Sequence, residues 1–240
     1  SDLRKQSAIM QDRVGANRAD IMGFTALGLF HAIADAIKMF TKEDFVPQGA
    51  NRFLHTLSPI IAVIPAILTF AVVPFGGQYE LWGTKVNLVI SDLDVGLLFV
   101  FAIASIATYG YVISGWASNN NWSLLGSMRT ASQMISYEVT MGLTIIGVLM
   151  VYGSMKLTEI GAAQEDFLSW GFFMQPLGFF MFLAASIAEN KRIPFDAPEA
   201  ESELVAGYFT EYSGLKFGMF FMAEFIEMVT IGAIVTILFF

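Results

Sequence analysis

A stretch of closely spaced carboxylates, residues 189–214, interrupts the apolar second half of the chain. Disordered acidic segments are poor in apolar residues, whereas this stretch also contains Pro194, Phe195, Pro198 and Leu204. Because proline fixes φ and removes a donor, we expect a stiff loop that holds several acids near a cavity. The alternative is a polar connector between membrane helices. The acids of residues 189–214 are Glu189, Asp196, Glu199, Glu201, Glu203 and Glu211, opposed by Lys191 and Arg192.

Three further carboxylates, Glu138, Glu224 and Glu227, lie inside long apolar runs, and Glu224 and Glu227 are three residues apart, so both should point roughly the same way. A charged side chain in the hydrocarbon region costs about 3 kcal/mol or more, so such a residue is a candidate functional site by default. Glu189, at the membrane end of its segment, could extend the same series. For a single acid of this kind we would prefer the interpretation that it forms a hydrogen bond between helices. For several such acids next to an acidic loop, we prefer the interpretation that they handle protons.

A second polar pattern lies between Phe24 and Lys42. His31, Asp35, Lys38 and Lys42 are spaced so that they share one face of a helix. This pattern predicts an amphipathic helix that lies at the membrane interface. Its polar stripe either faces water or lines a polar channel, and the spacing does not decide between them.

The composition indicates a membrane protein. The chain is 55% hydrophobic and 14% charged, whereas soluble domains are about 25% charged. The absence of cysteine excludes disulfides, iron–sulfur ligation and thiolate metal sites in this chain. The two histidines, His31 and His55, are too few and too far apart for a metal motif. The net charge of −8 argues against a nucleic-acid partner.

Five apolar segments approach or exceed the length of about 20 residues that a membrane-spanning helix needs. We therefore predict an all-α polytopic bundle that forms a single membrane domain over residues 1–240. Residues 1–56 are expected to form a cytoplasmic-side loop and the interfacial helix. Pro59, Pro65 and Pro74 predict a kink or tilt in the first span. The expected spans are 57–75, 95–115, 131–153, 167–188 and 217–240.

The distribution of positive charge predicts the orientation in the membrane. Eleven of the thirteen basic residues fall in the N-terminal region and in alternate loops, and only Lys85 and Lys156 fall elsewhere. The positive-inside rule then places residues 1–56 and the loops 116–130 and 189–216 in the cytoplasm. The membrane expected is the bacterial cytoplasmic (inner) membrane. Because the chain opens without methionine and ends in an apolar run, we expect it to be part of a longer protein.

Several motifs carry a resemblance to a known family. Residues 194–207, PFDAPEAESELVAG, and the following EYSG at 211–214 closely resemble the signature loop of the H subunit of NADH:quinone oxidoreductase, the quinone-site membrane subunit of respiratory complex I. Residues 28–43 resemble the first signature of that family, and residues 10–18, 115–119 and 136–139 resemble further motifs. The resemblance covers essentially the whole chain. It implies eight transmembrane helices, of which about five complete spans are present here.

The resemblance also implies roles for particular residues. The quinone would enter through a tunnel at the cytoplasmic boundary, and intramembrane carboxylates would couple its reduction to proton translocation. No complete active site, catalytic residue or metal site is expected in this chain alone. The implied quinone-tunnel residues are Arg4, Arg13, Asp35, Lys38, Phe195, Asp196 and Glu199. The implied proton path consists of Glu138, Glu189, Glu201, Glu203, Glu224 and Glu227.

The implied cofactors lie outside this chain. Quinone is the substrate and nothing is covalently bound, while the iron–sulfur clusters and FMN belong to partner subunits. The implied partners are peripheral-arm iron–sulfur subunits, small membrane subunits, antiporter-like subunits and lipid. The homologous subunit of a membrane-bound hydrogenase is an alternative, which the PFDAPEAE form of the loop disfavours. A secondary ion transporter is another, but such folds often contain inverted repeats and none is detected. A non-catalytic membrane scaffold is a third alternative, which the intramembrane acids disfavour because a scaffold would not need them.

The chain departs from the family pattern at several positions. Leu3 stands where the family usually has glutamate, and Glu227 stands where it often has an amide. His31 replaces the usual glutamine, and since histidine titrates near neutral pH, it could add a pH dependence. Three alanines replace larger or more rigid residues: Ala16, Ala32 and Ala197.

Overall fold

The structure is a computed structural model that describes residues 8–15, 30–81, 84–199 and 201–240. The chain divides into two compact units. The first comprises residues 1–45 and 212–218, and the second comprises residues 46–211 and 219–240. The two units are described in turn.

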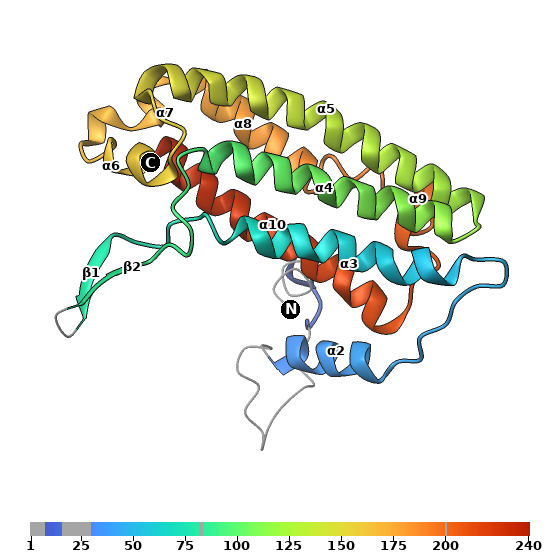
Figure 1. Ribbon diagram of the computed structural model, residues 1–240. Coiled ribbons are helices and arrows are strands. Elements are labelled where there is room, and N and C mark those ends of the chain that lie inside the picture. The colour runs from blue at the N-terminus through green and yellow to red at the C-terminus, as the bar shows by residue number, and fades with distance from the viewer. Residues whose placement is uncertain (1–7, 16–29, 82–83, 200) are drawn as a thin grey trace. The chain divides into compact units, whose positions relative to one another are not determined.

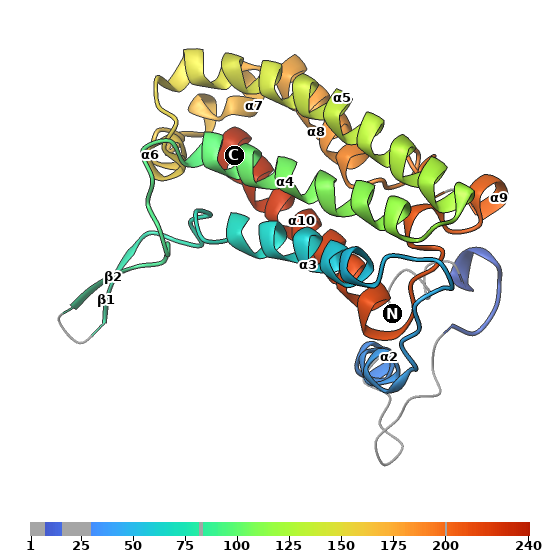
Figure 2. The same ribbon diagram turned by 45° about the vertical axis from the view of Figure 1, so that its right-hand side comes forward.

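Long apolar helices build the second unit. Helices α3 (Arg52–Thr69), α4 (Gly96–Ala117), α5 (Asn121–Tyr152) and α10 (Gly214–Phe239, of which residues from 219 belong here) are each long and apolar enough to cross a membrane. Helix α8 (Pro176–Glu189) is apolar but shorter. Figures 1 and 2 show α3, α4 and α5 side by side in chain order. The predicted all-α membrane fold is confirmed.

The hydrophobic core lies where α4, α5, α8 and α10 meet. Val100 of α4, Ile145 of α5, Phe182 of α8 and Leu238 of α10 are all buried in this one cluster. Asparagine side chains cap the N-termini of α3 and α5. The side chain of Asn51 accepts hydrogen bonds from the backbone amides of residues 53 and 54 at the start of α3, and that of Asn120 accepts from the amide of Trp122 at the start of α5.

Helix α5 begins earlier than the hydropathy pattern predicted. It starts at Asn121, so most of the expected loop 116–130 is helical. Its 32 residues span about 48 Å at 1.5 Å per residue, which exceeds the hydrocarbon thickness of about 30 Å. The first turns therefore carry buried polar residues such as Ser123 and Ser127, which pack within the protein.

The expected span over residues 167–188 is divided into three short helices. They are η2 (Phe167–Ser169), α7 (Gly171–Met174) and α8. Gln175 lies outside the helical region, at φ −139° and ψ 65°, because the proline that follows disfavours helical backbone at the residue before it. Pro176 then starts α8 at the position where a missing N–H costs nothing.

Short elements connect the long helices. A hairpin of β1 (Gln78–Leu81) and β2 (Thr84–Asn87) lies between α3 and α4, and its antiparallel register pairs Glu80 with Lys85. This hairpin was not predicted from the sequence. Helix α6 (Leu157–Ala162) follows α5, and α9 (Glu201–Leu204) and η3 (Gly207–Phe209) lie within the acidic loop.

The described part of the first unit contains α2 (Phe30–Thr41) and the start of α10. The predicted amphipathic helix is present over these residues, while 24–29 lie outside the described ranges. Three apolar residues of α2, Ile33, Ile37 and Phe40, are 58%, 58% and 72% exposed. The Lys216 ammonium lies 3.0 Å from the Asp44 carboxylate, and this pair joins the start of α10 to the segment after α2.

Candidate functional site: a buried ionisable cluster

The end of α8 sets the course of the acidic loop. The amide of Arg192 donates to the carbonyl of Ile187, and the amide of Lys191 donates to that of Ala188. This pair of bonds is the Schellman arrangement, in which the residue after the cap adopts left-handed backbone. That residue is usually glycine, but here it is Lys191, with φ 53°. The turn brings a lysine side chain to the inside of the protein.

Helix α5 fixes the next part of the loop. The side-chain amide of Gln133 donates to the carbonyls of Ala188 and Phe195, both at 2.7 Å. The Phe195 ring packs against Tyr137 with centroids 5.6 Å apart. Further along, Gly207 has φ 63°, and a Cβ there would collide with the carbonyl oxygen of Pro198. The loop therefore follows one defined path back to α10.

Four polar side chains meet inside this loop. The Lys191 ammonium lies 3.2 Å from Glu224 Oε1 and 3.8 Å from Glu199 Oε1. The Tyr208 hydroxyl lies 2.5 Å from Glu224 Oε1 and 3.3 Å from Glu199 Oε1, and it accepts from Lys191 at 3.3 Å. The side chains of Lys191, Glu199 and Glu224 are 1%, 21% and 4% exposed. We call these four residues the lysine cluster.

Aromatic rings enclose the lysine cluster. The Lys191 ammonium sits 3.8 Å from the ring centroid of Tyr111 and 5.0 Å from that of Tyr208. The two rings meet edge to face, 4.9 Å apart, and Phe220 packs on both. A desolvated cation over aromatic faces gains about 2 kcal/mol, which offsets part of the cost of burying the charge.

Burial and charge set the protonation states outside the spans. Burial, followed by the negative charge of Glu224, raises the pKa of Glu199 to about 8, although Lys191 opposes the shift. Burial lowers the pKa of Lys191, but the charges of Glu224 and Glu199 outweigh it, and the net pKa is raised. Burial also raises the pKa of Tyr208 well above its ordinary value. At neutral pH the lysine cluster therefore contains an ammonium, a protonated Glu199 and a neutral tyrosine.

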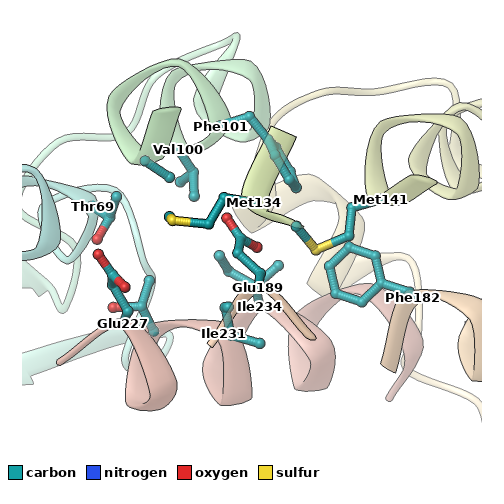
Figure 3. A pocket seen from close by; sticks show the side chains of 12 residues that line it. Thr69, Val100, Phe101, Met134, Met141, Phe182, Glu189, Glu227, Ile231 and Ile234 are labelled. Carbon is teal, nitrogen blue, oxygen red and sulfur yellow. The ribbon is translucent and has the colours of Figure 1, made fainter. Parts of the chain in front are cut away.

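A small cavity holds two more of the predicted acids. Glu189 of α8 and Glu227 of α10 line a cavity of about 40 Å³ whose other walls are mainly apolar, including Met134 and Phe182 (Figure 3). Figure 3 shows the Glu227 carboxylate next to Thr69. Since one water needs about 10–15 Å³ of such volume, the cavity has room for a few water molecules.

The structure gives different partners to two acids that lie one turn apart on α10. Three residues apart on α10, Glu224 and Glu227 were expected to point roughly the same way. Glu224 instead joins the lysine cluster, whereas Glu227 faces the cavity with Glu189. Glu138 of α5 is half-buried, and its Oε1 has no hydrogen-bond partner among the described residues.

The remaining predicted loop residues occupy varied environments. Glu203 is exposed and lies 2.6 Å from Arg129 of α5. Asp196 is also exposed. Glu201 begins α9, and its side chain lies outside the described part. Glu203 and Asp196 are not brought into the lysine cluster by any contact in the described part of the chain.

Four predicted tunnel residues belong to the N-terminal part of the chain. Arg4 lies outside the described residues, and Arg13 is exposed. The Asp35 carboxylate and the Lys38 ammonium are 3.9 Å apart on α2, one turn from each other. Both lie in the first unit, whereas Glu199 lies in the second. The tunnel that would combine them stays a prediction.

Sequence reasoning missed Lys191, Tyr208 and Tyr111 as members of the site. The sequence presented Lys191 as a charge that opposes the loop acids and helps to orient the chain, not as a buried member of a site. A signal was present, since a lysine directly after an apolar run and before several acids is a candidate for a buried ion pair. The tyrosines carried no such signal, because aromatic residues are common throughout this chain.

The fold and the site define a class of protein: a polytopic membrane protein with ionisable groups buried at the end of its helices. The chain belongs to the NADH dehydrogenase family, whose model matches residues 3–240. It is 51% identical over 236 residues to an NADH-quinone oxidoreductase H subunit, the one numbered 1, of Geobacter metallireducens, covering 98% of this chain and 70% of that protein. It is 49% identical to the H subunit numbered 2 of the Geobacter sulfurreducens NADH-quinone oxidoreductase, with the same coverage. The resemblance carried by the motifs is confirmed.

Proposed function

We propose that this chain is the membrane subunit of a proton-pumping NADH-quinone oxidoreductase that borders the quinone site. The names of its relatives support this assignment, as do the apolar helices that suit an integral membrane subunit. On this proposal the membrane is the bacterial cytoplasmic membrane, and the acidic loop faces the cytoplasm. FMN and iron–sulfur clusters belong to peripheral-arm partners, and small membrane and antiporter-like subunits are the neighbours in the membrane.

We further propose that the intramembrane acids conduct protons away from the quinone region. The observation that carries this proposal is the lysine cluster, in which the loop acid Glu199 and the span acid Glu224 are joined both directly and through one hydroxyl. The cavity with Glu189 and Glu227 offers the next position along the helices, and its volume suits a few waters. Glu138, Glu201 and Glu203 remain further candidates for the path.

The quinone tunnel is part of the same proposal. A ligand cavity of this kind combines apolar walls with a few polar groups at its end. Ile193 is 81% exposed and Phe195 is partly exposed on the acidic loop, and both could contact an isoprenoid tail. Asp196 and Glu199 on the loop, and Arg4, Arg13, Asp35 and Lys38 in the N-terminal region, are the proposed polar groups.

Replacement of Glu224 by glutamine tests the proposal. We expect Glu224→Gln to lower proton pumping and quinone reduction together in the assembled complex, by about tenfold or more, because a positioned acid or base contributes at least that much to proton transfer. Pumping is measured in proteoliposomes, and electron transfer from NADH to a hydrophilic acceptor reports the amount of intact peripheral arm.

A matched control is Glu165→Gln, which neutralises an exposed carboxylate beyond α6 and should leave both activities unchanged. Because Glu227 lies one turn from Glu224, the double variant with Glu227→Gln guards against substitution of one acid for the other. If the double variant pumps and turns over like the wild type, the two acids are structural and the proposed proton path is wrong.

A further inference from the structure

One hydroxyl group bridges the two carboxylates of the lysine cluster. Tyr208 Oη lies 2.5 Å from Oε1 of Glu224 and 3.3 Å from Oε1 of Glu199. A phenol has a single proton to donate, so at any moment it donates to one of the two acids. The same oxygen accepts from the Lys191 ammonium. The carboxyl groups of Glu199 and Glu224 also hydrogen-bond each other directly. The hydroxyl adds a second route, a relay in which it receives a proton from one acid while it donates to the other.

We propose that Tyr208 relays a proton between Glu199 of the loop and Glu224 of α10, with Lys191 as the shared counterion of whichever carboxylate is charged. This inference rests on the proposed function and adds two residues to it. In the forward step the protonated Glu199 gives its proton to Tyr208 Oη while the Tyr208 hydroxyl proton passes to the Glu224 carboxylate. Afterwards Glu199 is a carboxylate, Glu224 is a carboxylic acid and Tyr208 is again neutral.

The position of Lys191 explains how the charge can move. Its ammonium lies 3.2 Å from Glu224 Oε1 and 3.8 Å from Glu199 Oε1, so it is close to the negative charge both before and after the step. Burying an uncompensated charge is unfavourable, and a cation near both acids stabilises the negative charge on either one. Burial raises the pKa of Tyr208, which disfavours a tyrosinate during the transfer.

Other charged and titratable groups face the relay from the packed elements. Tyr111 of α4 covers the ammonium with its ring, and Glu189 of α8 and Glu227 of α10 act on it through their charges. Arg192, the next residue, lies against the ring of Phe225, with 5.3 Å from Cζ to the centroid. Lys191 is therefore the cation in direct contact with both relay acids in the described part of the chain.

The test is Tyr208→Phe in the complete complex, which keeps the ring and removes only the hydroxyl. We expect quinone reduction and proton pumping to fall by about 100-fold, the lower end of the contribution of a positioned proton-transfer group. Electron transfer from NADH to the hydrophilic acceptor should remain intact. Tyr152→Phe is the control, since it removes a tyrosine hydroxyl that donates to the Ser169 carbonyl at 2.8 Å, away from the lysine cluster.

A second substitution keeps the test decisive if Tyr208→Phe fails to assemble. A ring-fluorinated tyrosine at position 208 preserves shape and hydrogen bonds but makes the hydroxyl more acidic, and the relay predicts a changed turnover rate and solvent isotope effect. Lys191→Met should slow turnover, and Lys191→Arg should restore part of it, because the shared cation returns.

The outcomes distinguish the relay from the proposed function. The relay is overturned, and the proton path stands, if Tyr208→Phe turns over and pumps like Tyr152→Phe while Glu224→Gln does not pump. Where Tyr208→Phe does not assemble, the variant with fluorinated tyrosine at position 208 takes its place in this comparison. If Glu224→Gln with Glu227→Gln also has no effect, both fail. A large loss in Tyr208→Phe with an intact acceptor reaction supports the relay.

Discussion

Among single residues, Lys191 shows how strongly the site is constrained. A residue other than glycine in left-handed backbone costs roughly 1 kcal/mol, and a buried ammonium costs more unless it is paired. Both unfavourable features are present at Lys191, which has φ 53° and a side chain that is 1% exposed. Two carboxylates, a hydroxyl and two aromatic faces offset them. The backbone conformation and burial of Lys191 are therefore better explained by its contacts in the lysine cluster than by a role as a cytoplasmic charge that orients the chain.

The raised pKa of Glu199 predicts a pH dependence. Burial and the charge of Glu224 raise this pKa from 4.5 to about 8, so the folded protein retains a proton that the unfolded chain releases. Between about pH 4.5 and 8 stability therefore falls as the pH rises, since the folded state binds more protons. Infrared titration of the assembled complex should show a protonated carboxyl that is lost near pH 8.

The assignment of that carboxyl depends on two variants. Glu199→Gln should abolish the transition, and the exposed substitution Glu165→Gln should leave it in place. A transition that persists in Glu199→Gln would show that another acid carries the proton, and the proposed protonation state of the lysine cluster would be wrong.

Among the elements, close contact between α5 and η3 positions Tyr208. The hydroxyl of Ser123 on α5 donates to the carbonyl of Tyr208 at 2.9 Å. Gly126 of α5 faces Gly207, and a Cβ on Gly126 would come within 2.6 Å of the Gly207 Cα. Small residues allow such backbone approach between membrane helices and their neighbours, so this contact depends on the absence of a side chain.

A pair of glycine substitutions on α5 tests this contact. Gly126→Ala should move η3 and reduce the amount of assembled, quinone-active complex several-fold. Gly142→Ala on the same helix meets nothing within 4 Å and should be neutral or stabilising, because alanine favours helix over glycine by about 1 kcal/mol. The measurement is the yield of complex and its melting temperature in detergent. Equal effects of the two substitutions would argue against the close packing of α5 on η3.

Across the whole molecule, the distribution of basic residues predicts which end of the helices faces the cytoplasm. Lys156, one of the two exceptions, lies 2.9 Å from Asp92 in the segment that precedes α4. This ion pair holds the Lys156 side chain against that segment. Lys191 belongs to the buried site, so its side chain cannot report sidedness by surface labelling.

Cysteine labelling tests the orientation with exposed positions. The chain has no cysteine, so single substitutions give a clean background. Asp94→Cys, next to α4, replaces a side chain that is 95% exposed and should react with an impermeant reagent from the outer side. Asp196→Cys, on the exposed part of the acidic loop, should react only from the cytoplasmic side. The reverse pattern would invert the proposed topology.

Composition, hydropathy and motifs were enough to predict the class of protein, the family and most of the helices. Low charge and long apolar runs require a membrane environment, and this reasoning depends only on composition and length. The division of the span at 167–188 was less accessible, although Pro176 was a local signal for it.

Which ionisable groups meet could be learned only from the packing of the chain in three dimensions. Lys191 reaches Glu224 because α8 ends in a left-handed turn and because the loop returns along α5 through Gln133. Glu224 and Glu227 have different partners because α10 directs one toward Tyr208 and the other into the cavity. Spacing on one helix restricts the directions of side chains, but their partners come from distant segments, and only the packing of those segments determines the contacts.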